Sequence, residues 1–156
     1  MALLSACEDI TMHIRYNTSN KITTANDFGD VQLDFDVQID SILFDALTQC
    51  GVVYAASSEE RPYLVKLNEK GKFFVTFDPL DGSSIIDSNL AIGTIAAIWR
   101  KPEGVTDVIG MVPRVDMVGA ALSCYGSRTN IVLYNSKTKT VDELTLQRQD
   151  EGSACD

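Results

Sequence analysis

The sequence has few cysteines, no long apolar run and fewer basic than acidic residues, and each shortage removes a class of protein. Its 4 cysteines show no Cys-x-x-Cys spacing. A chain of this size needs no disulfide staples, so we expect reduced thiols and a cytoplasmic protein, or a plastid one if a transit peptide has been removed. No hydrophobic run approaches the length of a transmembrane helix. The 13 basic residues are outnumbered by 22 acidic ones, for a net charge of −9, which argues against nucleic-acid and membrane partners.

What the sequence does have is the composition of a folded domain and an ample supply of carboxylates. Of its 156 residues, 45% are hydrophobic and 22% are charged, which suffices to bury the core of one domain. Many of the acidic residues fall into two groups, one of Asp27, Asp30, Asp34, Asp36 and Asp40 and one of Glu59, Glu60, Asp78, Asp81 and Asp87. Two carboxylates about 4 Å apart repel by about 4 kcal/mol at an effective dielectric constant of about 20. A fold that gathers them therefore needs a cation or raised pKa values.

The most informative stretch runs from Phe73 to Ser84. Its apolar first half, 73–77, predicts a buried strand, and Pro79, which fixes φ and has no N–H, predicts that the strand stops there. Gly82-Ser83-Ser84 then predicts a turn into a helix whose amides point outward together. The stretch thus offers oxygen ligands for a cation and N–H groups for an anion, as a phosphate held by Mg²⁺ requires. The simpler alternative is an ordinary strand–turn–helix corner, because Asp, Pro, Gly and Ser are the usual turn residues.

The first half of the chain predicts two helices and a strand. Residues 3–16 have the periodicity of a helix, and the polar, turn-rich residues 17–29 indicate a loop. Over residues 30–49 two patterns conflict, because strand-like alternation through Ile39 is followed by helical spacing that Gly51 ends. Residues 52–56 have the composition of a short buried strand.

Glu59 and Glu60 follow the strand at 52–56, and their position relative to the next strands decides how they are interpreted. Taken alone, they fit a solvated loop with two exposed acids. However, 63–67 and 73–77 predict a hairpin, so the glutamates and the aspartates of the central stretch leave neighbouring strands and can meet at one edge of a sheet. Further along, 90–99 predicts a strand and 115–125 a packed helix. The last two segments, 130–134 and 140–146, predict a second hairpin.

Several of these segments resemble one known superfamily. The sequence at 78–84, Asp-Pro-Leu-Asp-Gly-Ser-Ser, is similar to the metal- and phosphate-binding signature of the sugar bisphosphatases and inositol monophosphatases, which hydrolyse phosphate monoesters with Mg²⁺. The continuation over 85–89, together with 28–33, 58–62 and 125–129, resembles the sedoheptulose-1,7-bisphosphatases more than the fructose-1,6-bisphosphatases.

The resemblance implies an α+β layered sandwich, namely the N-terminal half of the αβαβα fold of the sugar phosphatases, with a mixed sheet flanked by helices. It favours a helix from Leu33 to Gln49 and treats residues 1–156 as a single domain, and we expect the C-terminal sugar-binding half to be absent from this sequence. That half normally supplies a further metal-binding glutamate and the groups that hold the sugar. We therefore expect the isolated chain to be inactive or weakly active.

The resemblance also assigns a role to individual residues, with two or three Mg²⁺ ions as cofactors. The implied metal ligands are Asp30, Glu59, Asp78, the backbone carbonyl of Leu80, and Asp81. Glu60 and Asp36 resemble the pair that orients and deprotonates the attacking water. Gly82, Ser83 and Ser84 correspond to the residues that hold the phosphate being released.

The implied reaction is hydrolysis of the 1-phosphate of a ketose bisphosphate by a homo-oligomer, a dimer or a tetramer. The first expected substrate is sedoheptulose 1,7-bisphosphate, which would give sedoheptulose 7-phosphate, and fructose 1,6-bisphosphate is the second. A general inositol-phosphate phosphatase and a catalytically incomplete metal-binding chain are the alternatives.

Overall fold

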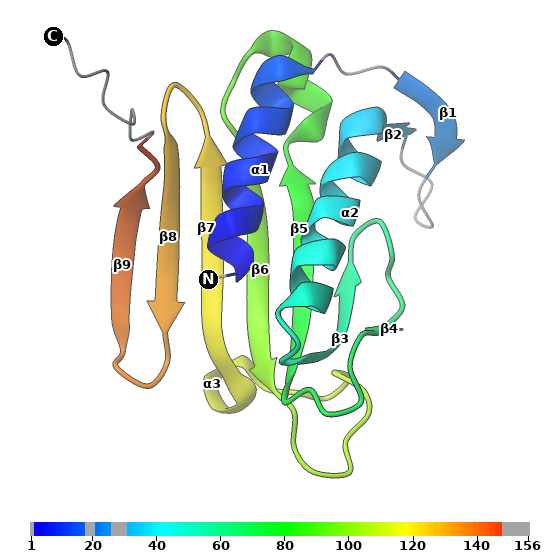
Figure 1. Cartoon of the computed structure of the whole chain (residues 1–156), viewed down its shortest axis with the longest axis vertical. Helices are drawn as coiled ribbons and strands as arrows, with labels where there is room; N and C mark the ends of the chain where they lie inside the picture. The colour runs from blue at the N-terminus through cyan, green and yellow to red at the C-terminus, as the bar shows by residue number, and fades with distance from the viewer. Residues whose placement is uncertain (1, 18–20, 26–30, 148–156) are drawn as a thin grey trace, which may run out of the picture.

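Two helices, α1 (Ala2–Tyr16) and α2 (Asp34–Gln49), lie side by side on one face of a seven-stranded sheet (Figure 1). The computed structural model describes residues 2–17, 21–25 and 31–147 of the chain. On α2, the side chains of Phe35, Ile39, Leu43 and Leu47 recur every fourth residue and are buried, which forms the apolar stripe that a helix packs against a sheet. Burying each such side chain contributes roughly 1.5–3 kcal/mol.

The sheet has the order β4-β3-β5-β6-β7-β8-β9. Its strands are β3 (Val53–Ser58), β4 (Val65–Lys66), β5 (Phe73–Asp81), β6 (Ile92–Arg100), β7 (Met117–Tyr125), β8 (Thr129–Asn135) and β9 (Thr140–Thr145). Every neighbouring pair is antiparallel except β3 and β5, which are parallel. This mixed sheet with helices on one face confirms the predicted fold class.

The parallel pairing of β3 and β5 corrects the predicted first hairpin. The short strand β4 pairs antiparallel with β3 rather than with β5, and the chain then crosses to the other side of β3 to form β5. Because β3 and β5 run in the same direction, their carboxyl ends lie at the same edge of the sheet. The predicted meeting of acidic residues at one edge thus has its structural basis in a parallel pair and not in a hairpin.

Two further predictions differ from the structure. Residues 17–29 contain a strand, β1 (Lys21–Ala25), which pairs with β2 (Val31–Leu33), so the strand-like alternation before α2 is real but short. Residues 117–125 form the strand β7 instead of a helix, and only Pro113–Asp116 is helical (α3). β7 lies inside the sheet between β6 and β8, and its nearly continuous apolar run does not distinguish a helix from an interior strand.

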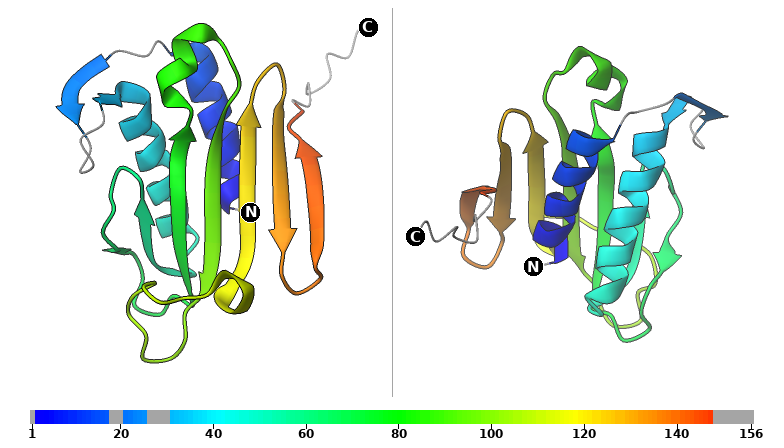
Figure 2. Two further views of the ribbon diagram at one scale, coloured as in Figure 1. Left: turned by 180° about the vertical axis from the view of Figure 1, so that it is seen from behind. Right: turned by 45° about the horizontal axis from the view of Figure 1, so that its top comes forward.

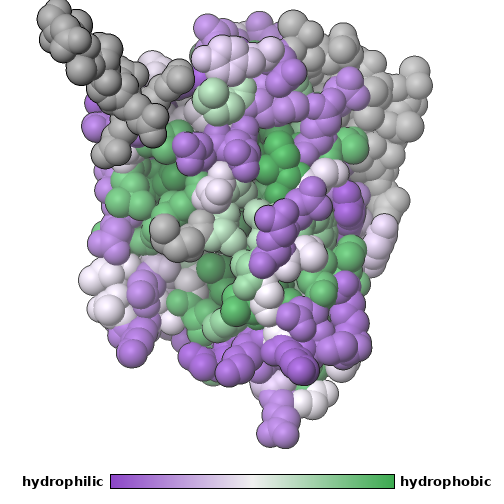
Figure 3. Space-filling model, viewed as in Figure 1, coloured by the Kyte–Doolittle hydropathy of each residue, from purple (hydrophilic) through white to green (hydrophobic). Residues whose placement is uncertain are grey.

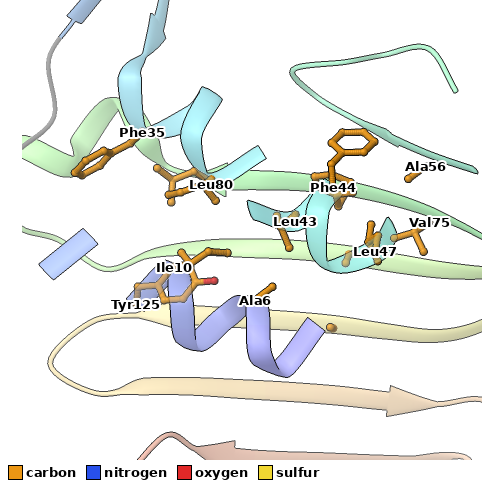
Figure 4. Packing of buried hydrophobic residues seen from close by; sticks show 14 of the residues in the cluster. Ala6, Ile10, Phe35, Leu43, Phe44, Leu47, Ala56, Val75, Leu80 and Tyr125 are labelled. Atoms are coloured by element: carbon orange, nitrogen blue, oxygen red, sulfur yellow. The ribbon is translucent and has the colours of Figure 1, made fainter. Parts of the chain in front are cut away.

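The main core lies between the helices and the sheet. Ala6 and Ile10 of α1 and Leu43 of α2 are fully buried there against Val75 of β5 and Tyr125 of β7 (Figure 4). Figure 2 shows the opposite face of the sheet, which the connection from β6 to α3 crosses at one end. Among the described residues, no helix combines the length and the apolar character needed to cross a bilayer.

Candidate functional site

Three of the predicted site residues, Glu59, Asp78 and Asp81, come together where β3 and β5 end, toward the upper end of the sheet in Figure 1. Glu59 directly follows β3, and its backbone N–H donates to the carbonyl of Phe77 on β5 at 3.1 Å. This bond fixes Glu59 beside Asp78, the next residue of β5. Two carboxylates from distant parts of the sequence thereby become neighbours.

A bulge in β5 brings the second aspartate to the same place. Asp78 lies opposite Ile95 of β6 and Asp81 lies opposite Gly93, so two residues of β5, Pro79 and Leu80, face one residue of β6. Side chains three apart on a regular strand point to opposite faces of the sheet, but the extra residue restores Asp78 and Asp81 to one face. β5 therefore continues through Pro79 to Asp81, which corrects the expectation that the proline ends the strand.

The electrostatics of Asp78 show that the site is short of positive charge. Burial and the negative charge of Glu59 raise the pKa of Asp78 to about 7, Asp81 adds to this shift, and a hydrogen bond from the Leu80 N–H to Asp78 Oδ1 (3.0 Å) opposes it. Without a cation, Asp78 therefore keeps its proton up to about neutral pH. A divalent cation that prefers hard oxygen ligands would replace that proton, so the chemistry of these carboxylates suits Mg²⁺.

A tight turn holds Glu59 and Glu60, and α2 anchors it. The Ser58 N–H donates to the Arg61 carbonyl, and the Arg61 N–H donates to Ser58 Oγ, both at 3.0 Å. The Arg61 side chain then reaches α2, where its Nε lies 2.8 Å from Asp40 Oδ2 and its guanidinium carbon lies 4.5 Å from the centre of the Phe44 ring. The turn is consequently fixed to the helix at two points.

Asp40 is the residue that sequence reasoning missed. It is only 1% exposed, and its burial raises its pKa while Ser58 and Arg61 lower it. The available signal was its position, because Asp36, Asp40, Leu43 and Leu47 fall on one face of α2. An aspartate on the core-facing side of a helix requires a partner.

The remaining predicted residues occupy different parts of this edge. Asp36 lies in the first turn of α2 and is 4% exposed, and Glu60 is half-buried beside Glu59. Gly82 takes a left-handed conformation (φ 84°) that L side chains rarely adopt, and it begins the 3₁₀ helix η1 (Ser83–Ser88). Gly82 is the N-cap of η1, and no side chain caps this helix by a hydrogen bond. Asp30 lies outside the described residues.

The structure brings Glu59, Asp78 and Asp81 to one edge without forming a closed metal cage. Within the part of the chain that is described, no group of three or more histidine, cysteine, aspartate or glutamate side chains is arranged to hold a metal ion. A separate groove of about 1160 Å³ lies between the two helices and the β8–β9 hairpin, where apolar surface is visible in Figure 3, and none of the described candidate residues lines it.

Comparison with known proteins gives consistent matches over nearly the whole chain. Residues 1–155 match the family described as fructose-1-6-bisphosphatase, N-terminal domain. The chain is 40% identical over 135 residues to the chloroplastic sedoheptulose-1,7-bisphosphatase of Spinacia oleracea, covering 85% of this chain and 34% of the relative. It is 35% identical over 131 residues to the class 1 fructose-1,6-bisphosphatase of Campylobacter jejuni (strain 81-176), covering 84% of this chain and 44% of that protein. The chain thus spans less than half the length of these curated relatives.

Solved structures agree with these matches. The fructose-1,6-bisphosphatase of Leishmania major in its holo form superposes with a TM-score of 0.85 at 34% identity, covering 94% of this chain and 49% of that one. The same Leishmania enzyme in its T-state gives a TM-score of 0.76 at 31% identity, with 94% and 46% covered. The mixed sheet and its two helices therefore correspond to the N-terminal half of this fold.

Proposed function

Because the chain belongs to the family of fructose-1-6-bisphosphatase N-terminal domains, we propose that its carboxylate edge serves the Mg²⁺-dependent hydrolysis of a sugar bisphosphate. The proposed reaction removes the 1-phosphate of sedoheptulose 1,7-bisphosphate and leaves sedoheptulose 7-phosphate, with fructose 1,6-bisphosphate as the second candidate substrate. The relatives include enzymes named for each sugar, at 40% and 35% identity. The observation that carries the proposal is the carboxyl pair Glu59–Asp78 at the ends of two parallel strands.

In this proposal the carboxylates divide the work between binding metal and moving a proton. Glu59, Asp78, Asp81 and the Leu80 carbonyl would hold two of the ions, and Asp30 would hold a third, more weakly. When bound, Mg²⁺ supplies charge neutralisation of the ester, polarisation of the attacking water and stabilisation of the departing alkoxide. Glu60 and Asp36 orient that water and take its proton. Gly82, Ser83 and Ser84 hold the phosphate by backbone N–H and hydroxyl groups, in the proposed arrangement.

The partial coverage of the relatives favours a second proposal, that the chain alone binds metal but turns over little substrate. Phosphate release with each bisphosphate separates the two, measured with and without Mg²⁺, on the chain and on Asp78→Ala. The matched comparison is a chimaera in which this chain replaces the corresponding N-terminal part of the Campylobacter enzyme. We expect weak or no turnover by the chain alone, and Mg²⁺-dependent turnover by the chimaera that Asp78→Ala abolishes. An inactive chimaera that folds would contradict the proposed function.

The partners and location follow from the same family membership and are proposed with it. We propose a homo-oligomer, in keeping with the T-state described for the Leishmania enzyme, and a cytoplasmic or plastid location, the latter as for the chloroplastic spinach relative. Light scattering of the purified chain measures its mass directly. A strictly monomeric chimaera with full activity would contradict the oligomer.

A further inference from the structure

A set of buried polar side chains lies behind the β5 bulge, on the face of the sheet that the helices cover. Thr94 of β6 is the single residue facing Pro79 and Leu80, and its Oγ1 lies 2.8 Å from the Pro79 carbonyl oxygen. The same Oγ1 lies 2.8 Å from the hydroxyl of Tyr125 on β7. Ser123 of β7 lies directly opposite Thr94, and its Oγ lies 2.8 Å from Cys7 Sγ of α1. The Tyr125 hydroxyl also interacts with both Cys7 and Ser123. The network thus connects α1 to the segment that carries Asp78 and Asp81.

The donors in this network follow from counting protons. A carbonyl oxygen only accepts, so Thr94 donates its one hydroxyl proton to the Pro79 carbonyl. The Tyr125 hydroxyl must therefore donate to Thr94 Oγ1. Burial raises the pKa of Tyr125 and of the Cys7 thiol, so both groups keep their protons at physiological pH. The direction of the network is consequently the same across the pH range in which the site would work.

The Pro79 carbonyl depends on this support because of the bulge. The extra residue interrupts the ladder between β5 and β6, and proline contributes no N–H that could hold the segment from its own side. Pro79 is fully buried and Thr94 is 4% exposed. A buried carbonyl that loses its donor carries the full cost of its desolvation, so the segment would have to move to find another partner.

We propose that Thr94, supported by Tyr125, is a positioning residue that holds the Asp78–Asp81 segment in the conformation that places both aspartates on one face. The placement itself does not need the proposed function, whereas its consequence for metal binding rests on it. A displacement of either carboxylate by about 1 Å is enough to impair a metal site. Thr94 acts on the two carboxylates only through the backbone between them.

The test of the placement is metal-free. The Leu80 N–H donates to Asp78 Oδ1, so its hydrogen exchange reports on the bulge and on the carboxylate together. In Thr94→Val, which keeps the shape and removes the hydroxyl, we expect this amide to exchange more than tenfold faster relative to the core amides of β7. Thr94→Ser, which restores the hydroxyl, should stay within about threefold of the original chain.

Thr11→Val is the matched control. Thr11 is also 4% exposed, and its hydroxyl also donates to a backbone carbonyl, that of Cys7, at 2.7 Å, and lies 3.0 Å from Thr129 Oγ1. Neither of these two partners is Thr94, Tyr125 or Pro79. A general loss of packing would therefore speed Leu80 exchange equally in both valine variants, and that result would overturn the proposal.

The second readout is affinity for Mn²⁺ and Mg²⁺, measured by calorimetry on the same variants. We expect Thr94→Val to weaken binding by about 10–100-fold, the usual effect of removing a residue that orients a metal ligand. Thr11→Val should leave it unchanged and Thr94→Ser should restore it. Unchanged affinity in Thr94→Val would overturn the positioning role.

If the original chain binds neither ion, the proposed function fails, while the exchange experiment still decides the placement. Should Thr94→Val not fold, Tyr125→Phe tests the same network, with a smaller expected effect.

Discussion

The carboxyl group of Asp40 is buried and that of Asp78 is half-buried. Both lie near the edge of the sheet that carries the candidate site, and their different neighbours give them different roles. Asp40 faces the guanidinium of Arg61 at 2.8 Å, which offsets part of the cost of burying its charge. Asp78 faces Glu59, another acid. The charge of the first residue is thus partly balanced within the folded chain, whereas the second requires a proton or a cation to balance its charge.

The first prediction concerns the pH dependence that Asp78 imposes. Its folded pKa of about 7 exceeds the ordinary value of 3.8, so between these values the folded state binds more protons than the unfolded state, and stability falls as pH rises from about 4 to about 7. Asp78→Asn should remove this loss. In EDTA, we expect the free energies of unfolding at pH 5 and pH 8, from urea titrations, to differ less in the variant than in the original chain. Equal differences in both would contradict the assignment.

The second prediction concerns Arg61, whose removal leaves Asp40 charged and buried. Arg61→Met keeps the apolar stem near Phe44 and should cost about 2–4 kcal/mol at pH 8. The loss should be smaller at pH 5, because protonation relieves the uncompensated Asp40 carboxylate. Denaturant unfolding measures both values. Arg128→Met, at an exposed position, should change stability by no more than about 0.5 kcal/mol; a similar loss there would show that the Arg61 effect is not specific.

At the scale of elements, most of the helices and strands can be predicted from the sequence, because their periodicity and composition are local properties. The helices at 3–16 and 33–49 and the last hairpin are confirmed. The partner of β5 cannot be predicted in this way, since the sequence of a strand as short as β4 does not indicate which strand it pairs with. Likewise, Pro79 predicts an end to β5, whereas the strand continues through a bulge at which Thr94 of β6 donates a hydrogen bond to the Pro79 carbonyl. The same non-local pairing explains why the sequence points to the acidic residues of the site but not to Asp40 or Thr94.

The third prediction tests the close approach of β6 and β7 beside the site. Gly93 lies opposite Asp81, and a Cβ atom built on it would lie 2.6 Å from the Ser123 carbonyl oxygen. Gly93→Ala should therefore push the two strands apart and cost about 2 kcal/mol or more. Gly126→Ala is the control, because its added Cβ would meet its nearest neighbour at an ordinary 3.6 Å. Thermal unfolding of both variants tests this prediction. Equal melting temperatures of Gly93→Ala and Gly126→Ala would contradict the close contact.

At the scale of the whole molecule, the net charge of −9 and the acidic edge make the response to divalent ions informative. Specific Mg²⁺ binding to the folded state stabilises it by mass action, whereas screening of a negative protein needs only ionic strength. We expect about 10 mM MgCl₂ to raise the melting temperature by about 2–4 °C for each kcal/mol of binding, above the value in NaCl of equal ionic strength. Glu59→Gln should lose this difference. An equal rise in both salts would indicate screening alone.

The parallel pairing of β3 and β5 also sets the order of events when the chain assembles. Glu59 and Asp78 are separated by the connection that contains β4, so they meet only after a crossover that closes late, because non-local pairing carries the entropy of a closed loop. A divalent ion then finds its ligands only in the finished sheet. The ion should therefore stabilise the folded state without helping to nucleate folding. Stopped-flow measurements should find that Mg²⁺ lowers the unfolding rate and leaves the refolding rate nearly unchanged.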